Sequence, residues 1–488
     1  MNFSQLIKKT GFNLNPAGLE DFSVRGISCN SAKVRDGFVF VAIQGNNVDG
    51  HDFIDEAIKK GVRGIVHSSR CKVRGKTGVA CVPVDDPRMA LAVLAAEFYG
   101  HPSSKLKVIG VTGTNGKTTV TYLLESMLKE AGFSVGVIGT VNYRFKDKAL
   151  PSLNTTPCAV EIQSMLAEMA QEKVKFAVME VSSHALDQRR VEGVRFAAAI
   201  FTNLTQDHLD YHRGMEGYFL AKARLFQGLD KEAFCILNYD DDYAGGIEKI
   251  TPAKIVTYGI NRPAQVMADK MQYSPESSRF TLKGLKGGEA VIESSFIGKH
   301  NIYNILAACA CCQALGIDFD KAESTLSRRL IVPGRLQRVE HKGGFSVFID
   351  YAHTEDALEN VLSSLRQIAK SKIILVFGCG GCRDKTKRPK MGRVATELAD
   401  YAVITSDNPR DEDPLSIIEE ITRGIRGENF CVEPDRRQAI KKALSMAGKT
   451  DIVLIAGKGH ENYQVFKNRK EHFDDIEVAG ECLKQLNY

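Results

Sequence analysis

A glycine-rich stretch at 108–119 holds the residue types and spacing best suited to chemistry. Gly113 and Gly116 allow backbone N–H groups to turn toward phosphate oxygens. Lys117 supplies a positive charge for the β- and γ-phosphates, and Thr118 supplies a hydroxyl for Mg²⁺. The stretch therefore predicts a site for a nucleoside triphosphate, whose expected contact residues are Gly113, Thr114, Asn115, Gly116, Lys117, Thr118 and Thr119.

The segments on either side support this interpretation of the loop. A strict P-loop has glycine where this chain has Val111, so the loop is a variant in which Gly113 takes that role. An apolar strand is predicted over 107–111. A helix should follow, because apolar residues recur at helical spacing as far as a stop signal at Gly132. The alternative is an ordinary glycine-rich turn between a strand and a helix.

The elements that must position this loop alternate between strand and helix from 105 to about 334. The strands are expected at 107–112, 134–140, 175–182, 197–203, 234–238 and 255–259. This alternation favours a mostly parallel sheet with helices on both faces. In such sheets ligands bind beyond the carboxyl ends of the strands. Polar clusters lie at those ends, at 180–184, 202–210 and 238–242.

A second alternating unit is predicted from about 335 to 488. Its strands are expected at 345–350, 372–377, 401–405 and 451–456, with helices at 357–369 and 414–425. Each strand ends in a polar or glycine-rich loop, at 350–353, 378–384, 406–410 and 457–461. Two sheets that present such ends suit an enzyme that closes one domain over another to join two substrates.

A third unit is predicted over the first 104 residues. A chain of 488 residues is too long for one core and suggests about three domains at about 150 residues each. This unit mixes short strands, such as 37–43, with a helix at 86–99, and its loop at 45–50 should be exposed. The polar segment 101–107 is a plausible boundary with the next domain.

Composition limits the classes of function. Sixty-five Lys and Arg against 59 Asp and Glu give a net charge of +6, without a basic tract of the kind that binds nucleic acid or a membrane surface. The start of the chain lacks a signal-peptide pattern, and the longest weakly polar run, of about 13 residues, is too short to span a membrane. We therefore expect a cytoplasmic protein.

The cysteines point to a reducing compartment. Twelve cysteines without regular spacing in a chain of this length suggest free thiols. Cys379 and Cys382 have the spacing of a metal or redox pair, but no second pair accompanies them. Because they follow a predicted strand in a glycine-rich turn, we expect this loop to shape a ligand site rather than to bind zinc.

Several motifs together resemble those of the Mur ligases, the ATP-dependent enzymes that build the peptide of peptidoglycan. They are GTNGKTT at 113–119, EVSSH at 180–184, DHLDYH at 207–212, PGR at 333–335, DYAH at 350–353 and DNPR at 407–410. The resemblance covers essentially the whole chain. It implies an α/β fold of three domains: an N-terminal UDP-substrate domain (1–104), a central P-loop ATPase-like domain with a parallel sheet (105–334) and a C-terminal Rossmann-like domain that binds the amino acid (335–488).

The resemblance also implies a reaction. The segment 407–414 is similar to that of the family member that adds meso-2,6-diaminopimelate to UDP-N-acetylmuramoyl-L-alanyl-D-glutamate. ATP would phosphorylate the D-glutamate side chain, and the incoming amine would displace phosphate from this acyl phosphate. Because ATP and the carboxylate are both anions, cations must neutralise them. We expect a monomer whose partners are these substrates, with no nucleic acid and no membrane insertion.

By the same resemblance, specific residues acquire catalytic and metal-binding roles. The implied catalytic residues are Lys117, Glu180, His208, Lys222 and His353. The implied Mg²⁺ ligands are Thr118, Glu180, His208 and, if carbamylated, Lys222. Carbamylation would turn the ammonium of Lys222 into an anion that can approach a metal ion. Without the family, a solvated helix lysine would be the favoured interpretation of Lys222, and structural polar residues that of Glu180 and His208.

The family pattern further implies two sets of binding residues. For the UDP substrate these are Ser31, Asn46, Asn47, Val48, Asn154, Thr155, Thr156, Ser182, Gln188 and Arg190. For the adenine and ribose of ATP they are Asn301, Asn304, Arg335 and Asp350. His300 departs from the pattern, which usually has an aromatic residue beside the adenine, and Glu355 replaces a common proline.

The amino-acid substrate is expected to bind arginine. meso-Diaminopimelate differs from lysine by a second carboxylate, which a guanidinium can hold with two hydrogen bonds. An arginine at the end of the DNPR motif therefore favours diaminopimelate, although a surface arginine that caps a turn is the alternative. The expected contacts are Arg383, Asp407, Asn408, Pro409, Arg410, Gly457 and Glu461.

Three other functions explain part of the sequence. A P-loop phosphotransferase would use Lys117 but leave the third domain and the DNPR motif without a role. A nucleotide-gated switch is weakened because the guanine-specific Asn-Lys-x-Asp motif is absent. A folate polyglutamate ligase shares the fold of the Mur ligases, but the long N-terminal domain and the DNPR motif argue against it.

Overall fold

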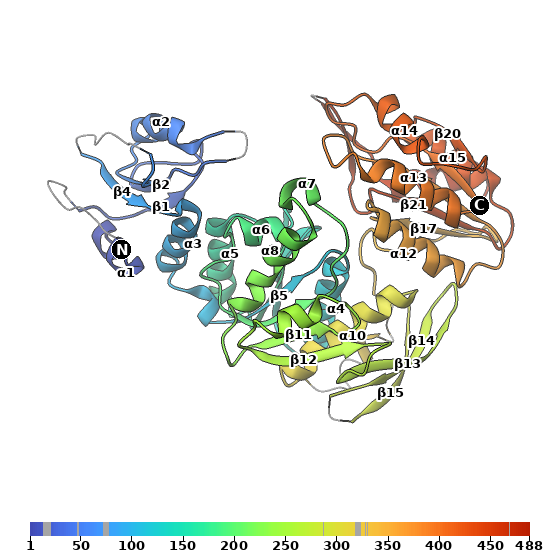
Figure 1. Cartoon of the computed structure of the whole chain (residues 1–488), viewed down its shortest axis with the longest axis horizontal. Helices are drawn as coiled ribbons and strands as arrows, with labels where there is room; N and C mark the ends of the chain where they lie inside the picture. Colours follow the sequence, from blue (N-terminus) through green and yellow to red (C-terminus); the bar gives the residue numbers. More distant parts are fainter. Residues whose placement is uncertain are drawn as a thin grey trace.

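The computed structural model describes residues 1–12, 21–45, 48–71, 78–285, 287–317, 324–326, 328, 330–467 and 469–488. Asn46 and Asn47, two of the expected substrate contacts, lie outside the described residues. Three sheets with their helices follow one another along the chain, and the central one lies between the other two (Figure 1). The α/β fold class and the three-domain organisation are confirmed.

The N-terminal domain is a small parallel sheet of four strands in the order β1-β2-β3-β4. The strands are β1 (Gly26–Ser28), β2 (Phe38–Val41), β3 (Gly64–Ser68) and β4 (Ala80–Val84), and the helices are α1 (Phe3–Thr10), η1 (Gly50–Phe53), α2 (Ile54–Lys59) and α3 (Pro87–Phe98). Helix α3 begins where Asp86 accepts hydrogen bonds from the N–H groups of Arg88 and Met89, with Pro87 in its first turn.

The central sheet has eleven strands in the order β15-β14-β13-β12-β11-β10-β5-β9-β6-β7-β8. Seven neighbouring strands are parallel: β13 (Val266–Tyr273), β12 (Lys254–Gly259), β11 (Phe234–Asn238), β10 (Phe196–Phe201), β5 (Lys107–Thr112), β9 (Phe176–Glu180) and β6 (Val135–Ile138). Antiparallel strands extend both edges: β14 (Ser278–Lys283) and β15 (Glu289–Ser294) at one, β7 (Asn142–Phe145) and β8 (Lys148–Pro151) at the other.

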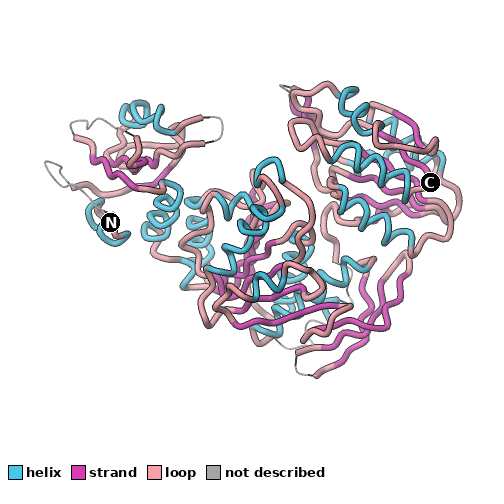
Figure 2. The backbone as a smooth tube through the Cα atoms, in the orientation of Figure 1, coloured by secondary structure: helices cyan, strands magenta, loops and turns pink. Residues whose placement is uncertain are grey.

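Helices cover both faces of this sheet (Figure 2). α4 (Lys117–Glu130) and α10 (Lys299–Ala314) pack together on one face, and α5 (Ala159–Gln171), α6 (Ser183–Asp187) and α8 (Met215–Gln227) lie on the other. Side chains alternate along a strand. Ile109 and Val111 of β5 therefore pack in the core beneath α4 and α10, and Val108 packs in the core beneath α5, α6 and α8. The shorter elements are η2 (Pro102–Ser104), α7 (Leu209–His212) and α9 (Ala244–Glu248).

The C-terminal domain is built on a six-stranded sheet in the order β16-β17-β21-β18-β19-β20. Its strands are β16 (Gln337–Val339), β17 (Ser346–Asp350), β18 (Ile373–Phe377), β19 (Tyr401–Ile404), β20 (Phe430–Val432) and β21 (Ile452–Ala456), all parallel except β16. The remaining elements are α12 (Glu355–Arg366), α13 (Lys387–Leu398), α14 (Pro414–Thr422), α15 (Arg436–Met446), α16 (Asp475–Gln485) and the hairpin β22 (Tyr463–Phe466) with β23 (Arg469–His472).

The strands expected after residue 104 are all present, with ends that differ from the expected ones by no more than two residues. The antiparallel extensions at the edges of the central sheet were not expected. Their strands carry many partly exposed polar residues, so they lack the apolar runs by which the buried parallel strands are recognised. Across the described ranges, no helix combines the length and apolar character needed to cross a membrane.

Candidate functional site

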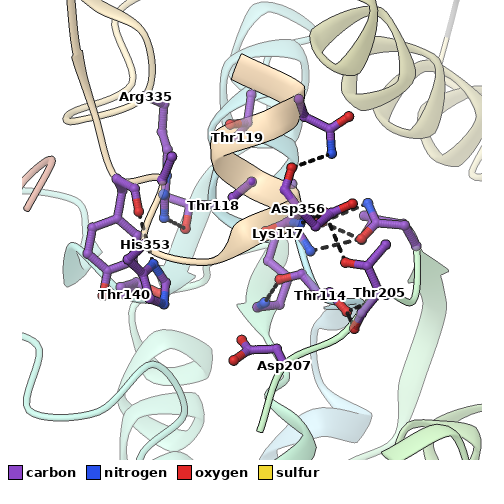
Figure 3. Close-up of a pocket in the computed structure, with 18 of the residues that line it drawn as sticks. Thr114, Lys117, Thr118, Thr119, Thr140, Thr205, Asp207, Arg335, His353 and Asp356 are labelled. Atoms are coloured by element: carbon purple, nitrogen blue, oxygen red, sulfur yellow. Dashed lines mark hydrogen bonds between the residues drawn. The ribbon is translucent and has the colours of Figure 1, made fainter. Parts of the chain in front are cut away.

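A cavity of about 930 Å³ lies where the central domain faces the C-terminal domain. Its walls are the P-loop, the loops that follow β9, β10, β17, β19 and β21, and one side of helix α12. These loops all lie at the carboxyl ends of parallel strands, where ligands bind in such sheets. Figure 3 shows part of this cavity, with Lys117 and Thr118 of the P-loop near Arg335 and Asp356 of the C-terminal part.

The P-loop wraps tightly between β5 and α4. Gly113 has φ of +144°, and a Cβ at this position would lie 1.9 Å from Oγ1 of Thr202, so only glycine fits. The Lys117 ammonium donates to the carbonyls of Gly113 and Thr114, at 3.0 and 2.8 Å. Burial lowers the pKa of Lys117. A cation held at the mouth of a glycine loop is well placed to bind phosphate oxygens.

Glu180, at the end of β9, is a buried carboxylate held only by neutral donors. Its side chain accepts hydrogen bonds from the Thr118 hydroxyl at 3.0 Å and from the N–H and hydroxyl of Thr140 at 2.9 and 2.8 Å. Glu180 is only 1% exposed, and no ion-pair partner for it occurs in the described part of the chain. A buried anion without a counter-ion next to a threonine hydroxyl fits Mg²⁺, which prefers oxygen ligands.

Lys222, in α8, lies behind the P-loop and does not line the cavity. Its ammonium donates to the carbonyl of Gly113 at 2.7 Å and lies 4.5 Å from the centre of the Tyr218 ring. Burial, with a further effect of Lys117, lowers the pKa of Lys222 well below its usual value. Burial therefore works against the charged form of this side chain, and the neutral amine is the form that can react with carbon dioxide.

Two histidines face the cavity from opposite domains. His208 has φ of +55° before helix α7, and its Nε2 lies 3.4 Å from Oδ2 of Asp207. Burial lowers its pKa to about 3. His353 follows β17, its Nδ1 lies 2.9 Å from the carbonyl of Tyr351, and burial lowers its pKa to about 4. Both imidazoles are therefore neutral near pH 7, which leaves them able to accept a proton or bind a metal.

The expected adenine and ribose contacts gather at one end of the cavity. Arg335 donates from Nη2 to Oγ1 of Thr118 at 3.2 Å (Figure 3), and its guanidinium stacks 4.5 Å from the centre of the Tyr351 ring. Asp350 accepts the N–H of Leu336 at 2.7 Å, and burial raises its pKa. Asn301 and Asn304 in α10 also line this end, joined by a hydrogen bond of 3.1 Å. His300 lines it as well.

The expected contacts for the UDP substrate are only partly brought together. Asn154, Thr155, Thr156, Ser182 and Arg190 line the cavity. Gln188 does not, and its amide oxygen accepts hydrogen bonds from Arg190. Ser31 and Val48 belong to the N-terminal domain and lie outside this cavity; Ser31 donates to Glu56, and Val48 is 56% exposed.

The expected amino-acid contacts border the adenine and ribose set, since the N–H of Gly457 donates to the carbonyl of Asp350 at 3.1 Å. Arg383, Asp407, Asn408, Arg410, Gly457 and Glu461 line the cavity, whereas Pro409 does not. Arg410 has φ of +53°, and its Nη1 donates to the carbonyl of Gly381 at 2.7 Å. Asn408 donates to Oε2 of Glu461 at 2.8 Å, and burial raises the pKa of Glu461. The buried ammonium of Lys458 lies 3.5 Å from that same oxygen.

Among the residues that sequence reasoning missed are two that contact the P-loop or Glu180 through their side chains. Thr140 lies at the end of the expected strand 134–140, so the rule that ligands bind at strand ends could have singled it out. Asp356, in the first turn of α12, accepts hydrogen bonds from Asn115 and Thr205 (Figure 3). Nothing in the local pattern distinguishes Asp356 from other acidic residues at helix starts.

Family models match three segments of the chain. Residues 23–99 match the "Mur ligase family, catalytic domain", residues 111–312 the "Mur ligase middle domain", and residues 334–459 the "Mur ligase, glutamate ligase domain". Together these segments cover most of the sequence, including the P-loop and most of the loops that line the cavity.

Curated relatives match over nearly their whole length. The UDP-N-acetylmuramoyl-L-alanyl-D-glutamate–2,6-diaminopimelate ligase of Bacillus velezensis is 45% identical, with 96% of each chain covered. The ligase 1 of the same name from Clostridium acetobutylicum is 44% identical, with 95% of each covered.

Solved structures agree with the fold. A structure of a ligase with this name is 31% identical, with a TM-score of 0.68 over 95% of this chain and 96% of that one. The MurF ligase of Thermotoga maritima in complex with ADP is 21% identical, with a TM-score of 0.64 over 95% and 97% of the two chains, and shows likeness of fold alone.

Taken with the phosphate loop and its facing domain, these findings define the class: an ATP-dependent ligase that forms an amide bond. ATP is its co-substrate, and Mg²⁺ is the metal ion usually associated with such ligases. The chain belongs to the Mur ligase family.

Proposed function

We propose that this enzyme adds meso-2,6-diaminopimelate to UDP-N-acetylmuramoyl-L-alanyl-D-glutamate, with ATP converted to ADP and phosphate, in the synthesis of peptidoglycan precursors. The observation that carries the proposal is the single cavity that contains the P-loop, the acceptor threonines and the arginines of the third domain. The names of the relatives that match over nearly the whole chain support the same substrates.

The reaction has two covalent steps. An oxygen of the D-glutamate side-chain carboxylate attacks the γ-phosphorus of ATP, and the bond to ADP breaks. The amine of diaminopimelate, after losing a proton, then attacks the acyl carbon, and phosphate leaves with the acyl oxygen. Lys117 faces the phosphates and offsets part of their charge, which lets the carboxylate approach.

The metal site of the proposal combines residues of three elements. Thr118 and Glu180 would hold one Mg²⁺, and His208 with a carbamylated Lys222 would serve a second. Bound there, Mg²⁺ would neutralise phosphate charge as anionic groups come together. The buried position of Lys222 and its lowered pKa support carbamylation. His353 lines the cavity opposite, where its neutral ring can hydrogen-bond to the reacting groups.

The amino-acid end has the charges that diaminopimelate requires. In the described part of the chain only Nη1 of the Arg410 guanidinium makes hydrogen bonds, to carbonyl oxygens, so Nε and Nη2 are left to bind the second carboxylate. Arg383 lines the same end. Glu461, held by Asn408, suits the ammonium group. Lysine lacks the second carboxylate and would leave the arginines without their partner.

The proposal extends to the other binding residues, the domains and the setting. Ser31, Val48, Thr155, Thr156 and Arg190 would hold the UDP substrate once the N-terminal domain contributes to the site. We place the domain boundaries at 104/105 and 334/335. The enzyme works as a monomer in the cytoplasm, where ATP and its nucleotide substrates are found.

The decisive experiment measures phosphate release from ATP with UDP-N-acetylmuramoyl-L-alanyl-D-glutamate, comparing meso-diaminopimelate with L-lysine. Wild type should respond to diaminopimelate and much less to lysine. Arg410→Ala should lose at least about tenfold in kcat/KM for diaminopimelate, because a charge-assisted contact contributes about 1.5–3 kcal/mol. Arg423→Ala, at an exposed arginine in α14's C-cap, is the matched control and should behave as wild type.

Two results would count against the proposal. Equal use of lysine and diaminopimelate would leave the ligase reaction but remove the role of Arg410 in selectivity. Phosphate release that needs no amine would favour a phosphotransferase instead.

A further inference from the structure

Thr140, in the turn after β6, forms hydrogen bonds with both oxygens of the Glu180 carboxylate. Its N–H donates to Oε1 at 2.9 Å, and its hydroxyl donates to Oε2 at 2.8 Å. The preceding residue, Gly139, makes this approach possible, because a Cβ there would lie 2.5 Å from Oε1. A carboxylate held on both oxygens has little freedom to rotate, so Thr140 fixes the direction in which Glu180 faces the cavity.

The same hydroxyl also touches the acceptor side of the cavity. Oγ1 of Thr140 lies 3.1 Å from Oγ1 of Thr155. A hydroxyl has one proton to donate and can accept as well. Thr140 is the donor in both contacts, so its one proton serves either Glu180 or Thr155, and a ligand that engages Thr155 leaves this proton to Glu180. Thr155 follows Asn154 in the same loop. The hydroxyl of Tyr143 in β7 donates to the carbonyl of Asn154 at 2.6 Å and so holds this loop against the β7 hairpin.

On its other side Glu180 meets the nucleotide loop. Oε2 accepts the hydroxyl of Thr118, which in turn accepts Nη2 of Arg335 from the C-terminal domain. The Thr140 hydroxyl thus lies between the acceptor loop and Glu180, and hydrogen bonds continue from Glu180 to the P-loop and to Arg335 of the third domain. Side-chain networks of this kind respond as a unit when one member changes partner.

We propose that Thr140 is a positioning residue that orients Glu180 for the metal–nucleotide complex and couples acceptor binding at Thr155 to nucleotide binding at Thr118. The inference rests on the proposed function, which identifies the acceptor as the UDP-linked dipeptide. Coupling between two ligands is reciprocal. The acceptor therefore tightens Mg²⁺–ADP binding by the same factor by which Mg²⁺–ADP tightens acceptor binding.

Titration calorimetry on the full-length enzyme tests this coupling. The dissociation constant of ADP is measured with Mg²⁺, with EDTA, and with Mg²⁺ plus UDP-N-acetylmuramoyl-L-alanyl-D-glutamate. Thr140→Val removes the hydroxyl at nearly constant volume, and Thr140→Ser keeps it. Thr121→Val is the matched control, because Thr121 is a buried threonine of α4 whose hydroxyl bonds only to helix carbonyls. Thr140→Ala replaces the valine variant if that one does not fold.

The expected result is specific to Mg²⁺. Thr140→Val should weaken Mg²⁺–ADP binding about tenfold, as expected for one lost hydrogen bond to a charged group, and leave ADP binding in EDTA unchanged. The tightening by the acceptor, present in wild type, should disappear in Thr140→Val and return in Thr140→Ser. Thr121→Val should match wild type throughout.

Other results would overturn the proposal. If Thr140→Val binds Mg²⁺–ADP as tightly as wild type does, and the acceptor still strengthens that binding to the same extent, the Thr140 hydroxyl does not orient Glu180. An equal loss with Mg²⁺ and with EDTA would indicate a purely structural role. The proposed function is tested separately by whether wild type binds the acceptor at all. If wild type does not bind the acceptor, both the proposed function and the coupling are wrong. The comparison of ADP binding with Mg²⁺ and with EDTA still tests whether Thr140 orients Glu180.

Discussion

Lys222 shows how burial changes the chemistry of a single residue. Its ammonium is surrounded by the Tyr218 ring and a P-loop carbonyl, with no carboxylate bonded to it in the described residues. Burial disfavours the ammonium form of Lys222, and a carbamate on this lysine would be an anion able to bind a metal.

We expect a carbamate on Lys222, detectable by ¹³C NMR of the enzyme equilibrated with ¹³C-bicarbonate and Mg²⁺. The carbamate carbon signal should be present in wild type and lost in Lys222→Ala, together with most of the ligase activity. Lys129→Ala, which removes a lysine of α4 with an exposed side chain, should retain the signal. A signal that persists in Lys222→Ala would place the modification elsewhere.

At the scale of elements, the start of helix α12 fastens the C-terminal domain to the P-loop. Oδ2 of Asp356 accepts Nδ2 of Asn115 at 2.6 Å and the hydroxyl of Thr205 at 2.9 Å (Figure 3). Next to it, Glu355 pairs with Arg393 at 3.0 Å, so this departure from the family's usual proline brings α12 and α13 together.

Removing this contact should weaken nucleotide use more than acceptor use. Asp356→Ala should raise the KM for ATP about tenfold, since it breaks hydrogen bonds to a charged group that are worth about 1.5–3 kcal/mol. The KM for the UDP substrate should stay within about twofold, because Asp356 lies on the nucleotide side. Steady-state kinetics test this, with Glu359→Ala, an exposed acid in the same helix, as the control. Equal changes in both KM values would contradict a specific link between α12 and the P-loop.

A second link between elements makes stability depend on pH. Arg388 of α13 is fully buried and pairs with Glu412 at 2.9 Å and with Glu420 at 2.8 Å. The hydrogen bonds from Arg388 are the main cause that lowers the pKa of Glu412 from 4.5 to about 2. Because the folded state lowers this pKa, the stabilisation is complete above about pH 4.5 and is lost as the pH falls toward 2.

The denaturation midpoint in urea, measured from pH 7 to pH 3, tests this dependence. Glu412→Gln should be less stable than wild type at pH 7, and the difference should shrink as the pH falls below about 4.5. Glu428→Gln, at an exposed glutamate, should show no difference at either pH. A gap between Glu412→Gln and wild type that stays constant with pH would exclude ionisation of Glu412 as its source.

At the scale of the whole molecule, the sequence was most informative about features that a single short segment determines. Buried parallel strands are continuous apolar runs, so 107–112 and 234–238 were predicted to the residue. The P-loop and the DNPR motif are likewise local. The edge hairpins were missed because their strands alternate apolar with polar residues, such as Phe280 and Leu282 in β14, and so lack a continuous apolar run.

The cavity itself depends on contacts between distant segments, which explains the remaining differences. Thr140 matters because it meets Glu180, 40 residues further along, and Asp356 because it meets Asn115, 241 residues away. Family resemblance supplied many of the lining residues, but it could not show that Gln188 and Pro409 lie outside the cavity. Those placements follow only from how the loops pack in three dimensions.

Gly334, the last residue before the third domain, leaves no room for a side chain. It has φ of +66°, and a Cβ there would lie 2.2 Å from the backbone nitrogen of His460, in the loop after β21. Gly334 is therefore packed within the body of the third domain rather than in a hinge. We expect any rotation of the third domain to occur before residue 334 in the chain and to carry Arg335 with it. Its hydrogen bond to Thr118 would then form only when the two domains are closed.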